Sequence, residues 1–114
     1  MKRVYVAGKL SDNHIEYVKH VHRMIIWAEK IRQLGFSVYV PGLDFLYGIV
    51  FGNLEYLDYF TNSQPWLDVS DAIFLVPGWE TSAGTKKEIE RATKQGIPVY
   101  LYLETLAKEL GDLK

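Results

Sequence analysis

AIFLVPGWETSAGTKKE, residues 72–88, joins an apolar run to a polar loop and then to a helical pattern. The run Ala72–Val76 is uninterrupted, as in a strand that is buried on both faces of a parallel sheet. Gly78 and Gly84 punctuate the loop, and Glu88 follows early in the helix. In open α/β sheets, ligands bind at the corner where such a strand ends. We therefore expect Glu88 to lie beside a crevice, where a carboxylate can act as a nucleophile or a base.

Strand-like and helical patterns alternate on both sides of this stretch. Strands are expected at residues 4–7, 36–40, 72–76 and 97–103, and helices at 14–34, 83–95 and 104–110. This alternation indicates parallel βαβ units joined by right-handed crossovers. The predicted class is α/β, with a mainly parallel sheet in the order 2-1-3-4 and a single domain over residues 1–114. In that order, the loops at residues 8–12 and 77–84 would form two walls of one crevice.

Residues 42–66 fit no single element. A helix from about Asn53 to Thr61 is expected, and the whole segment is rich in aromatic residues: Phe45, Tyr47, Phe51, Tyr56, Tyr59, Phe60 and Trp66. These rings can pack in the core or a lid, form an interface between subunits, or stack against a nucleobase. All three interpretations stay open.

The composition excludes several classes of protein. A formal net charge of -1 provides no field to attract a nucleic acid polymer, and the absence of cysteine excludes disulfides and thiol catalysis. The three histidines have no carboxylate at zinc-ligand spacing, so we expect no metal site. We also expect no cofactor. No apolar run approaches the roughly 20 residues that span a membrane. No secretory signal is visible, so we expect a cytoplasmic protein without membrane contact.

Several key residues have both a structural and a functional interpretation. Thr85 and Glu88 fit a capping box, in which Thr85 caps the helix and Glu88 bonds back to its backbone N–H. Alternatively, Glu88 flanks the stripe that faces the sheet and reaches the crevice. Ser82 is either a plain helix cap or, with the turn at Gly84, an anion contact at a helix N-terminus. Tyr5, inside the first strand, is either a core residue or a partner of the carboxylate.

Three motifs carry a resemblance to a known family: Val4-Tyr5-Val6-Ala7-Gly8, then SDAIFLVPGWE at residues 70–80, and Ser82-x-Gly84-x-x-x-Glu88-x-x-x-Ala92. Over nearly its whole length the chain resembles the nucleoside 2-deoxyribosyltransferase-like superfamily. That superfamily includes 2′-deoxynucleoside 5′-phosphate N-hydrolases and a small uncharacterised branch of phages and bacteria. The resemblance implies a flavodoxin-like or Rossmann-like three-layer sandwich in a homodimer or larger homo-oligomer.

The glutamate of that family attacks C1′ of a deoxyribose and forms a covalent glycosyl-enzyme, which water or a second base resolves. The resemblance implies that Glu88 is this nucleophile and Tyr5 the tyrosine that holds it. It further implies that Ser82 contacts a 5′-phosphate and that Gly8 and Gly84 let the backbone approach the ligand. The loops add further candidates for substrate binding: Lys9, Ser11, Asp44, Gly78, Trp79 and Glu80, with base recognition or proton donation open to Asp44 and Glu80.

Two positions depart from the family pattern. Ser63 stands where the hydrolase branch carries an aspartate, which Asp58 or Asp68 could replace, and Lys9 stands where many relatives carry a small residue. The expected function is cleavage or transfer of the N-glycosidic bond of a 2′-deoxynucleoside or its 5′-monophosphate through a glycosyl-glutamate intermediate. The alternative, which Ser63 favours, is a nucleotide-binding module without catalysis. In both cases the partner is a small nucleoside or nucleotide.

Overall fold

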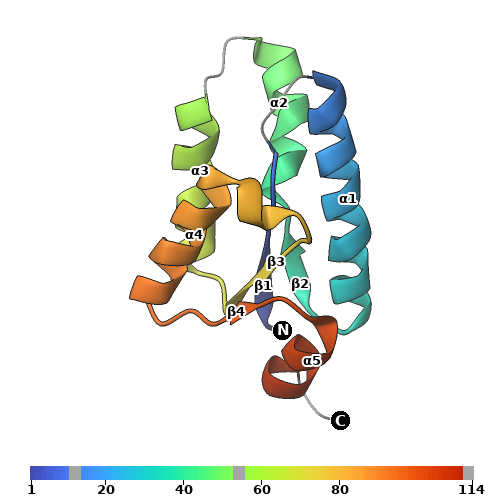
Figure 1. The fold of residues 1–114 in the computed structure, drawn as a ribbon, viewed down its shortest axis with the longest axis vertical. Helices are drawn as coiled ribbons and strands as arrows, with labels where there is room; N and C mark the ends of the chain where they lie inside the picture. The colour runs from blue at the N-terminus through green and yellow to red at the C-terminus, as the bar shows by residue number, and fades with distance from the viewer. Residues whose placement is uncertain (11–13, 53–55, 112–114) are drawn as a thin grey trace.

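A four-stranded parallel sheet forms the centre of the molecule, for which the computed structural model describes residues 1–10, 14–52 and 56–111 (Figure 1). The strands are β1 (Arg3–Ala7), β2 (Ser37–Tyr39), β3 (Ala72–Leu75) and β4 (Val99–Tyr100). They pair in the order β2-β1-β3-β4, and every pair is parallel. The predicted α/β class and strand order are therefore confirmed. Since β1 has β2 on one side and β3 on the other, the connections leave β1 in opposite directions, which is the arrangement that opens a crevice.

Helices cover both faces of the sheet and make a Rossmann-like three-layer sandwich (Figure 1). On one face, α1 (His14–Gln33) and α5 (Leu103–Leu110) pack against Val4 and Val6. On the other face, α3 (Tyr56–Asp68) and α4 (Ala83–Lys94) pack against Tyr5 and Ala7. This division follows from the strand geometry, because successive side chains point to opposite faces. Tyr5 therefore points toward the layer that carries Glu88.

The segment that fits no single element in the sequence contains a helix that was not expected. After β2, a 3₁₀ turn at Pro41–Leu43 leads directly into α2 (Asp44–Phe51). The amphipathic pattern that normally reveals a helix is weak here, because α2 is almost entirely apolar after Asp44.

Helix α3 ends later than predicted. It continues to Asp68 through Pro65, whereas the expected helix stopped at Thr61; the expected start at Asn53 lies outside the described residues. A proline inside a helix removes one hydrogen bond and crowds the preceding turn. Leu67, in the last turn, is completely buried against the sheet, and this burial offsets the cost of the proline.

The C-terminal elements are close to those predicted. β4 is limited to Val99–Tyr100, shorter than the expected strand at residues 97–103, because α5 already begins at Leu103. Gly96, with a φ of +75°, follows the end of α4 as the sequence predicts. Among the described helices, none has the length and apolar character needed to cross a membrane.

Candidate functional site

A cavity of about 290 Å³ lies at the carboxyl ends of β1, β2 and β3. Its volume is near the lower end of the range for small-molecule sites. The residues after each of these strands contribute to its wall, together with α1, α3 and α4: Gly8, Leu10, Tyr17, Pro41, Asp44, Tyr59, Phe60, Ser63, Ser82, Ala83, Gly84, Thr85, Lys87 and Glu88. The cavity is therefore at the switch point of the sheet, where the strand order predicts a ligand site.

Glu88 is the buried acid of this cavity, with 8% of its surface exposed. Its carboxylate accepts a hydrogen bond from the hydroxyl of Tyr5. The two meet because Tyr5 faces the α3–α4 layer and because Thr85, Glu88 and Ala92 form the inward face of α4 at helical spacing. A strand residue and a helix residue far apart in the sequence thus form one polar pair inside the core.

The capping-box interpretation of Thr85 and Glu88 is wrong. Helix α4 starts earlier, at Ala83, and its cap is Ser82. The Ser82 Oγ accepts hydrogen bonds from the backbone N–H of Thr85 at 3.1 Å and from the Thr85 Oγ1 at 2.9 Å. Because Ser82 already caps the N-terminus of α4, Glu88 does not act as a capping residue, and its side chain faces the cavity.

The surroundings of Glu88 shift its ionisation into the neutral range. Burial raises the pKa of Glu88 from 4.5 to about 7, while hydrogen bonds from Tyr5 and Gln64 oppose the rise. Burial, followed by the neighbouring carboxylate, raises the pKa of Tyr5 far above its ordinary value, so its phenol stays a proton donor. A carboxyl group that titrates near neutral pH in a cleft has the properties of a nucleophile or a base.

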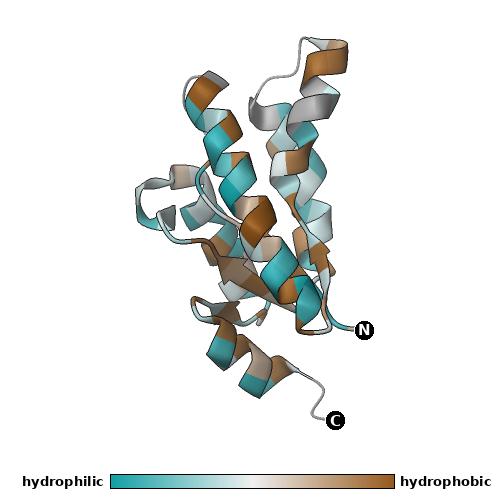
Figure 2. Ribbon diagram, turned by 90° about the vertical axis from the view of Figure 1, so that its right-hand side faces the viewer, coloured by the Kyte–Doolittle hydropathy of each residue, from teal (hydrophilic) through white to brown (hydrophobic). Residues whose placement is uncertain are grey.

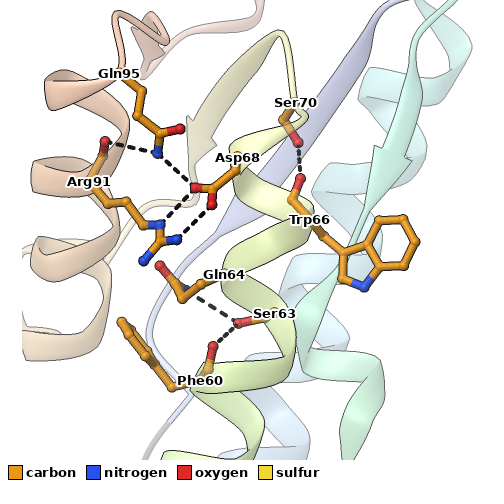
Figure 3. A network of polar contacts seen from close by, with 8 residues as sticks. All are labelled: Phe60, Ser63, Gln64, Trp66, Asp68, Ser70, Arg91 and Gln95. Atoms are coloured by element: carbon orange, nitrogen blue, oxygen red, sulfur yellow. Dashed lines mark hydrogen bonds and ion pairs between the residues drawn. The ribbon is translucent and has the colours of Figure 1, made fainter.

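Helix α3 brings a serine and a glutamine close to this pair, with Ser63 within hydrogen-bond reach of Tyr5 and Gln64 within reach of Glu88. Figure 3 shows both residues on α3. Ser63 and Gln64 are both buried; Gln64 Nε2 donates to Ser63 Oγ at 3.4 Å, and Ser63 Oγ donates to the carbonyl of Phe60 at 3.2 Å. Hydrogen bonding with Ser63 also lowers the pKa of Tyr5, against the larger effect of burial. Ser63, which the resemblance places where the hydrolase branch carries an aspartate, therefore presents a hydroxyl group on the cavity wall.

Neither of the two other aspartates of α3 takes over that position. Asp68 accepts hydrogen bonds from Arg91 at 2.7 and 2.6 Å and from Gln95 at 2.7 Å, all outside the cavity (Figure 3). Asp58 is exposed and lines a neighbouring hollow rather than the cavity itself.

Asp44 is the second carboxyl group on the cavity wall. It is half-buried, its Oδ2 is buried without a hydrogen bond, and burial raises its pKa. Tyr17 and Tyr59 lie beside it, and burial, Tyr59 and then Asp44 raise the pKa of Tyr17 to about 12. An unsatisfied carboxylate oxygen between aromatic rings is an unusual feature of a folded protein and suits a ligand with donor groups.

The structure brings part of the predicted site together. Tyr5 donates a hydrogen bond to Glu88 beneath the cavity. Five of the predicted residues line the cavity wall: Gly8, Asp44, Ser82, Gly84 and Glu88. Packing also favours glycine at position 8, since a Cβ atom there would come within 3.1 Å of the Cβ of Val76, closer than ordinary van der Waals contact. The cavity thus includes the residues after β1 and the start of α4, as the sequence predicts for the two walls.

Other predicted residues do not line the cavity. Gly78, Trp79 and Glu80 belong to the turn that precedes α4, where Trp79 packs against the core beneath α3 and α4. Lys9 is half-buried but does not line the cavity, and Ser11 lies outside the described residues.

Sequence reasoning missed several members of the wall. Tyr59 and Phe60 were named only as part of the aromatic-rich segment, for which stacking against a nucleobase was one of three open interpretations. Tyr17 and Lys87, which line the wall, and Gln64, which bonds to Ser63 beside it, occupy ordinary helical positions that carry no such signal. In the described part of the chain, no group of three or more His, Asp or Glu side chains is placed to hold a metal ion.

A family model described as a domain of unknown function, DUF4406, matches residues 2–101. The chain belongs to the DUF4406 family. The matched range contains every strand of the sheet and the residues that form the cavity, so the candidate site lies within the DUF4406 domain. No curated protein matches the chain.

Proposed function

We propose that this DUF4406 protein cleaves or transfers the N-glycosidic bond of a 2′-deoxynucleoside or its 5′-monophosphate. The observation that carries the proposal is the buried carboxylate of Glu88, bonded to Tyr5 at a cavity above the carboxyl ends of the sheet. The resemblance of the motifs around Tyr5, Ser82 and Glu88 to the nucleoside 2-deoxyribosyltransferase-like superfamily supports the same reaction.

The proposed reaction has two steps at C1′ of the sugar. A carboxylate oxygen of Glu88 bonds to C1′ while the C1′–N bond breaks, and the electron pair leaves with the base, which takes up a proton. The transition state is oxocarbenium-like and is stabilised by the adjacent negative charge. Water or a second base then bonds to C1′, loses a proton and releases Glu88. Tyr5 donates to Oε2 of the carboxylate and thereby orients it.

The start of α4 is suited to the sugar or its phosphate. Ser82 accepts two hydrogen bonds, yet its own hydroxyl proton remains to be donated. Gly84 lines the cavity at the N-terminal end of α4, where backbone N–H groups and the helix dipole favour an anion. The proposed contact therefore combines the hydroxyl group of Ser82 with the backbone at Gly84.

The second candidate function is a nucleotide-binding module without catalysis. Ser63 is the observation in its favour, because the cavity wall has a hydroxyl group where the hydrolase branch has a carboxyl group. Asp58 and Asp68 both lie outside the cavity. This candidate predicts that a nucleotide binds and that no base is released.

Release of free base separates the two functions. The protein is incubated with deoxynucleosides and their 5′-monophosphates, and the products are resolved by chromatography. Glu88→Gln should abolish release while keeping the size of the side chain. Glu90→Gln is the matched control, since Glu90 lies on the same helix but is exposed and paired with Lys94 at 3.6 Å. Release at an unchanged rate by Glu88→Gln would show that the proposed nucleophile is wrong.

Thermal stability provides the second measurement. A nucleotide that binds the folded protein raises its melting temperature. A rise without any product in the unmodified protein would favour the binding module over the enzyme.

A further inference from the structure

Asp44 is held at the cavity by the backbone that follows β2. The 3₁₀ turn at Pro41–Leu43 closes on it, with the Asp44 N–H bonded to the carbonyl oxygens of Gly42 and Pro41. In the described part of the chain its side chain forms no ion pair, and its buried Oδ2 has no donor. A buried acceptor without a donor lowers the stability of the folded state, and no contact of Asp44 among the described residues compensates for this loss. Such an acceptor is explained if a ligand supplies the missing N–H groups.

The surroundings of Asp44 suit a flat heterocycle. Tyr17 from α1 and Tyr59 and Phe60 from α3 line the same cavity. Asp44 and Glu88 both lie close enough to Tyr39 to affect it: burial, Asp44 and then Glu88 raise the pKa of Tyr39 to about 12. The two carboxyl groups therefore belong to one site. If the sugar lies against Glu88 and its 5′ end against the start of α4, the base extends toward the aromatic residues and Asp44.

A carboxylate can only accept hydrogen bonds, and it accepts two adjacent N–H groups best. The guanine edge presents N1–H and the 2-amino group side by side. Hypoxanthine presents N1–H alone. Adenine and cytosine place a ring nitrogen with a lone pair beside their amino group, and thymine flanks its N–H with two carbonyl oxygens. A second carboxylate oxygen is repelled by each of these neighbouring acceptors.

We propose that Asp44 recognises the base and selects a guanine-type edge with two adjacent N–H donors. This inference rests on the proposed function of the cavity, because it takes the deoxynucleoside to be bound there. Rotation about the Cβ–Cγ bond lets either oxygen of Asp44 meet the ligand. Tyr17 and Tyr59 hold the ring in place but do not distinguish one base from another.

Equilibrium binding tests the inference without relying on turnover. Calorimetric titrations use the Glu88→Gln protein and the 5′-monophosphates of deoxyguanosine, deoxyinosine, deoxyadenosine, deoxycytidine and thymidine. Deoxyguanosine and deoxyinosine differ only in the 2-amino group, so their comparison isolates one N–H donor. We expect the guanine nucleotide to bind at least about tenfold more tightly than the hypoxanthine nucleotide, as a hydrogen bond to a charged group predicts.

The matched variant is Asp44→Asn, which keeps the shape but replaces one acceptor by a donor. It should remove the preference for the guanine nucleotide, whereas Glu90→Gln in the same background should keep it. Equal affinities for the guanine and hypoxanthine nucleotides overturn the inference even if Asp44→Asn does not fold. A preference that survives Asp44→Asn, or that favours adenine or cytosine, also overturns it. Base release without guanine preference defeats this inference alone, while failure of every nucleotide to bind defeats it together with the proposed function.

Discussion

Glu88 keeps its proton in the folded protein over a pH range in which the unfolded chain has lost it. Its folded-state pKa is about 7, raised by burial from 4.5. Between these values the unfolded state binds fewer protons, so the free energy of unfolding falls as the pH rises. The stabilisation is complete below about pH 4.5 and is lost by about pH 7, with a total on the order of 3 kcal/mol.

Denaturant unfolding at pH 4.5 and pH 8 measures this effect. We expect Glu88→Gln to lose most of the fall in stability between the two pH values, because the amide does not titrate. Glu90→Gln, which removes an exposed carboxylate, should keep the fall seen in the unmodified protein. An identical pH dependence in Glu88→Gln and the unmodified protein would mean that Glu88 is ionised throughout and is not buried as described.

Single residues also show where sequence reasoning reached its limit. The pairing of Tyr5 with Glu88 was anticipated by the resemblance, and the buried strand Ala72–Val76 made the position of the following loop clear. The start of α4 was ambiguous, because a capping residue could be placed at Ser82 or one turn later at Thr85. Gln64 could not be found, since a buried glutamine has no pattern of its own in the sequence.

At the scale of elements, one exposed cluster joins the two helices that form the wall around Glu88. Asp68 of α3 accepts hydrogen bonds from Arg91 and Gln95 at the end of α4 (Figure 3). The hydrogen bond from Arg91 lowers the pKa of Asp68 to about 2. The stabilisation of the folded state by this cluster is therefore fully present above the ordinary pKa of 3.8 and is lost as the pH falls toward 2. The cluster keeps Ser63 and Gln64 of α3 close to Glu88 of α4.

We expect Asp68→Asn to lower the free energy of unfolding at pH 7 by up to about 1 kcal/mol, because the paired side chains are largely exposed. Urea unfolding measures the change. The isolated pair of Glu90 and Lys94 provides the comparison, and its loss in Glu90→Gln should cost no more than about 0.5 kcal/mol. A smaller loss for Asp68→Asn than for Glu90→Gln would contradict a role in joining α3 to α4.

The elements that could be predicted are those with a strong local signal. β1 and β3 were visible because parallel strands that are buried on both faces read as apolar runs. The end of α1 was visible because Gly35 follows it, at a φ of +100°. Helix α2 lacks a polar face, and Pro65 predicts an end that α3 does not have. In both cases burial against the rest of the molecule, which the local sequence does not report, decides the structure.

At the scale of the whole molecule, two helices leave large apolar side chains in contact with solvent. Figure 2, viewed from the side of α1, shows hydrophobic residues interspersed with hydrophilic ones along that helix. The exposed residues are Ile15, Val18, Ile25 and Ile26 on α1, and Tyr47, Ile49, Val50 and Phe51 on α2. Exposed apolar side chains that gather in a patch commonly mark an interface between proteins.

Together with the family resemblance, this surface leads us to expect a homodimer or a larger homo-oligomer in solution. Light scattering coupled to size-exclusion chromatography measures the mass directly. A mass of at least twice the 13.2 kDa of the chain agrees with the expectation. A monomer that persists at every concentration would contradict it, and the apolar surface of α1 and α2 would then need another explanation.

Covalent labelling of Glu88 is the most direct test of the proposed reaction. A 2′-deoxy-2′-fluoro nucleoside 5′-monophosphate can trap the intermediate, because the electron-withdrawing fluorine destabilises the oxocarbenium-like transition state through which the bond between the sugar and Glu88 is broken. Mass spectrometry of the digested protein should locate the fluorinated sugar on Glu88, with no label in Glu88→Gln and full label in Glu90→Gln. A label on another residue, or base release from the natural nucleotide by a protein whose Glu88 is never labelled, would contradict the assignment of Glu88 as the nucleophile.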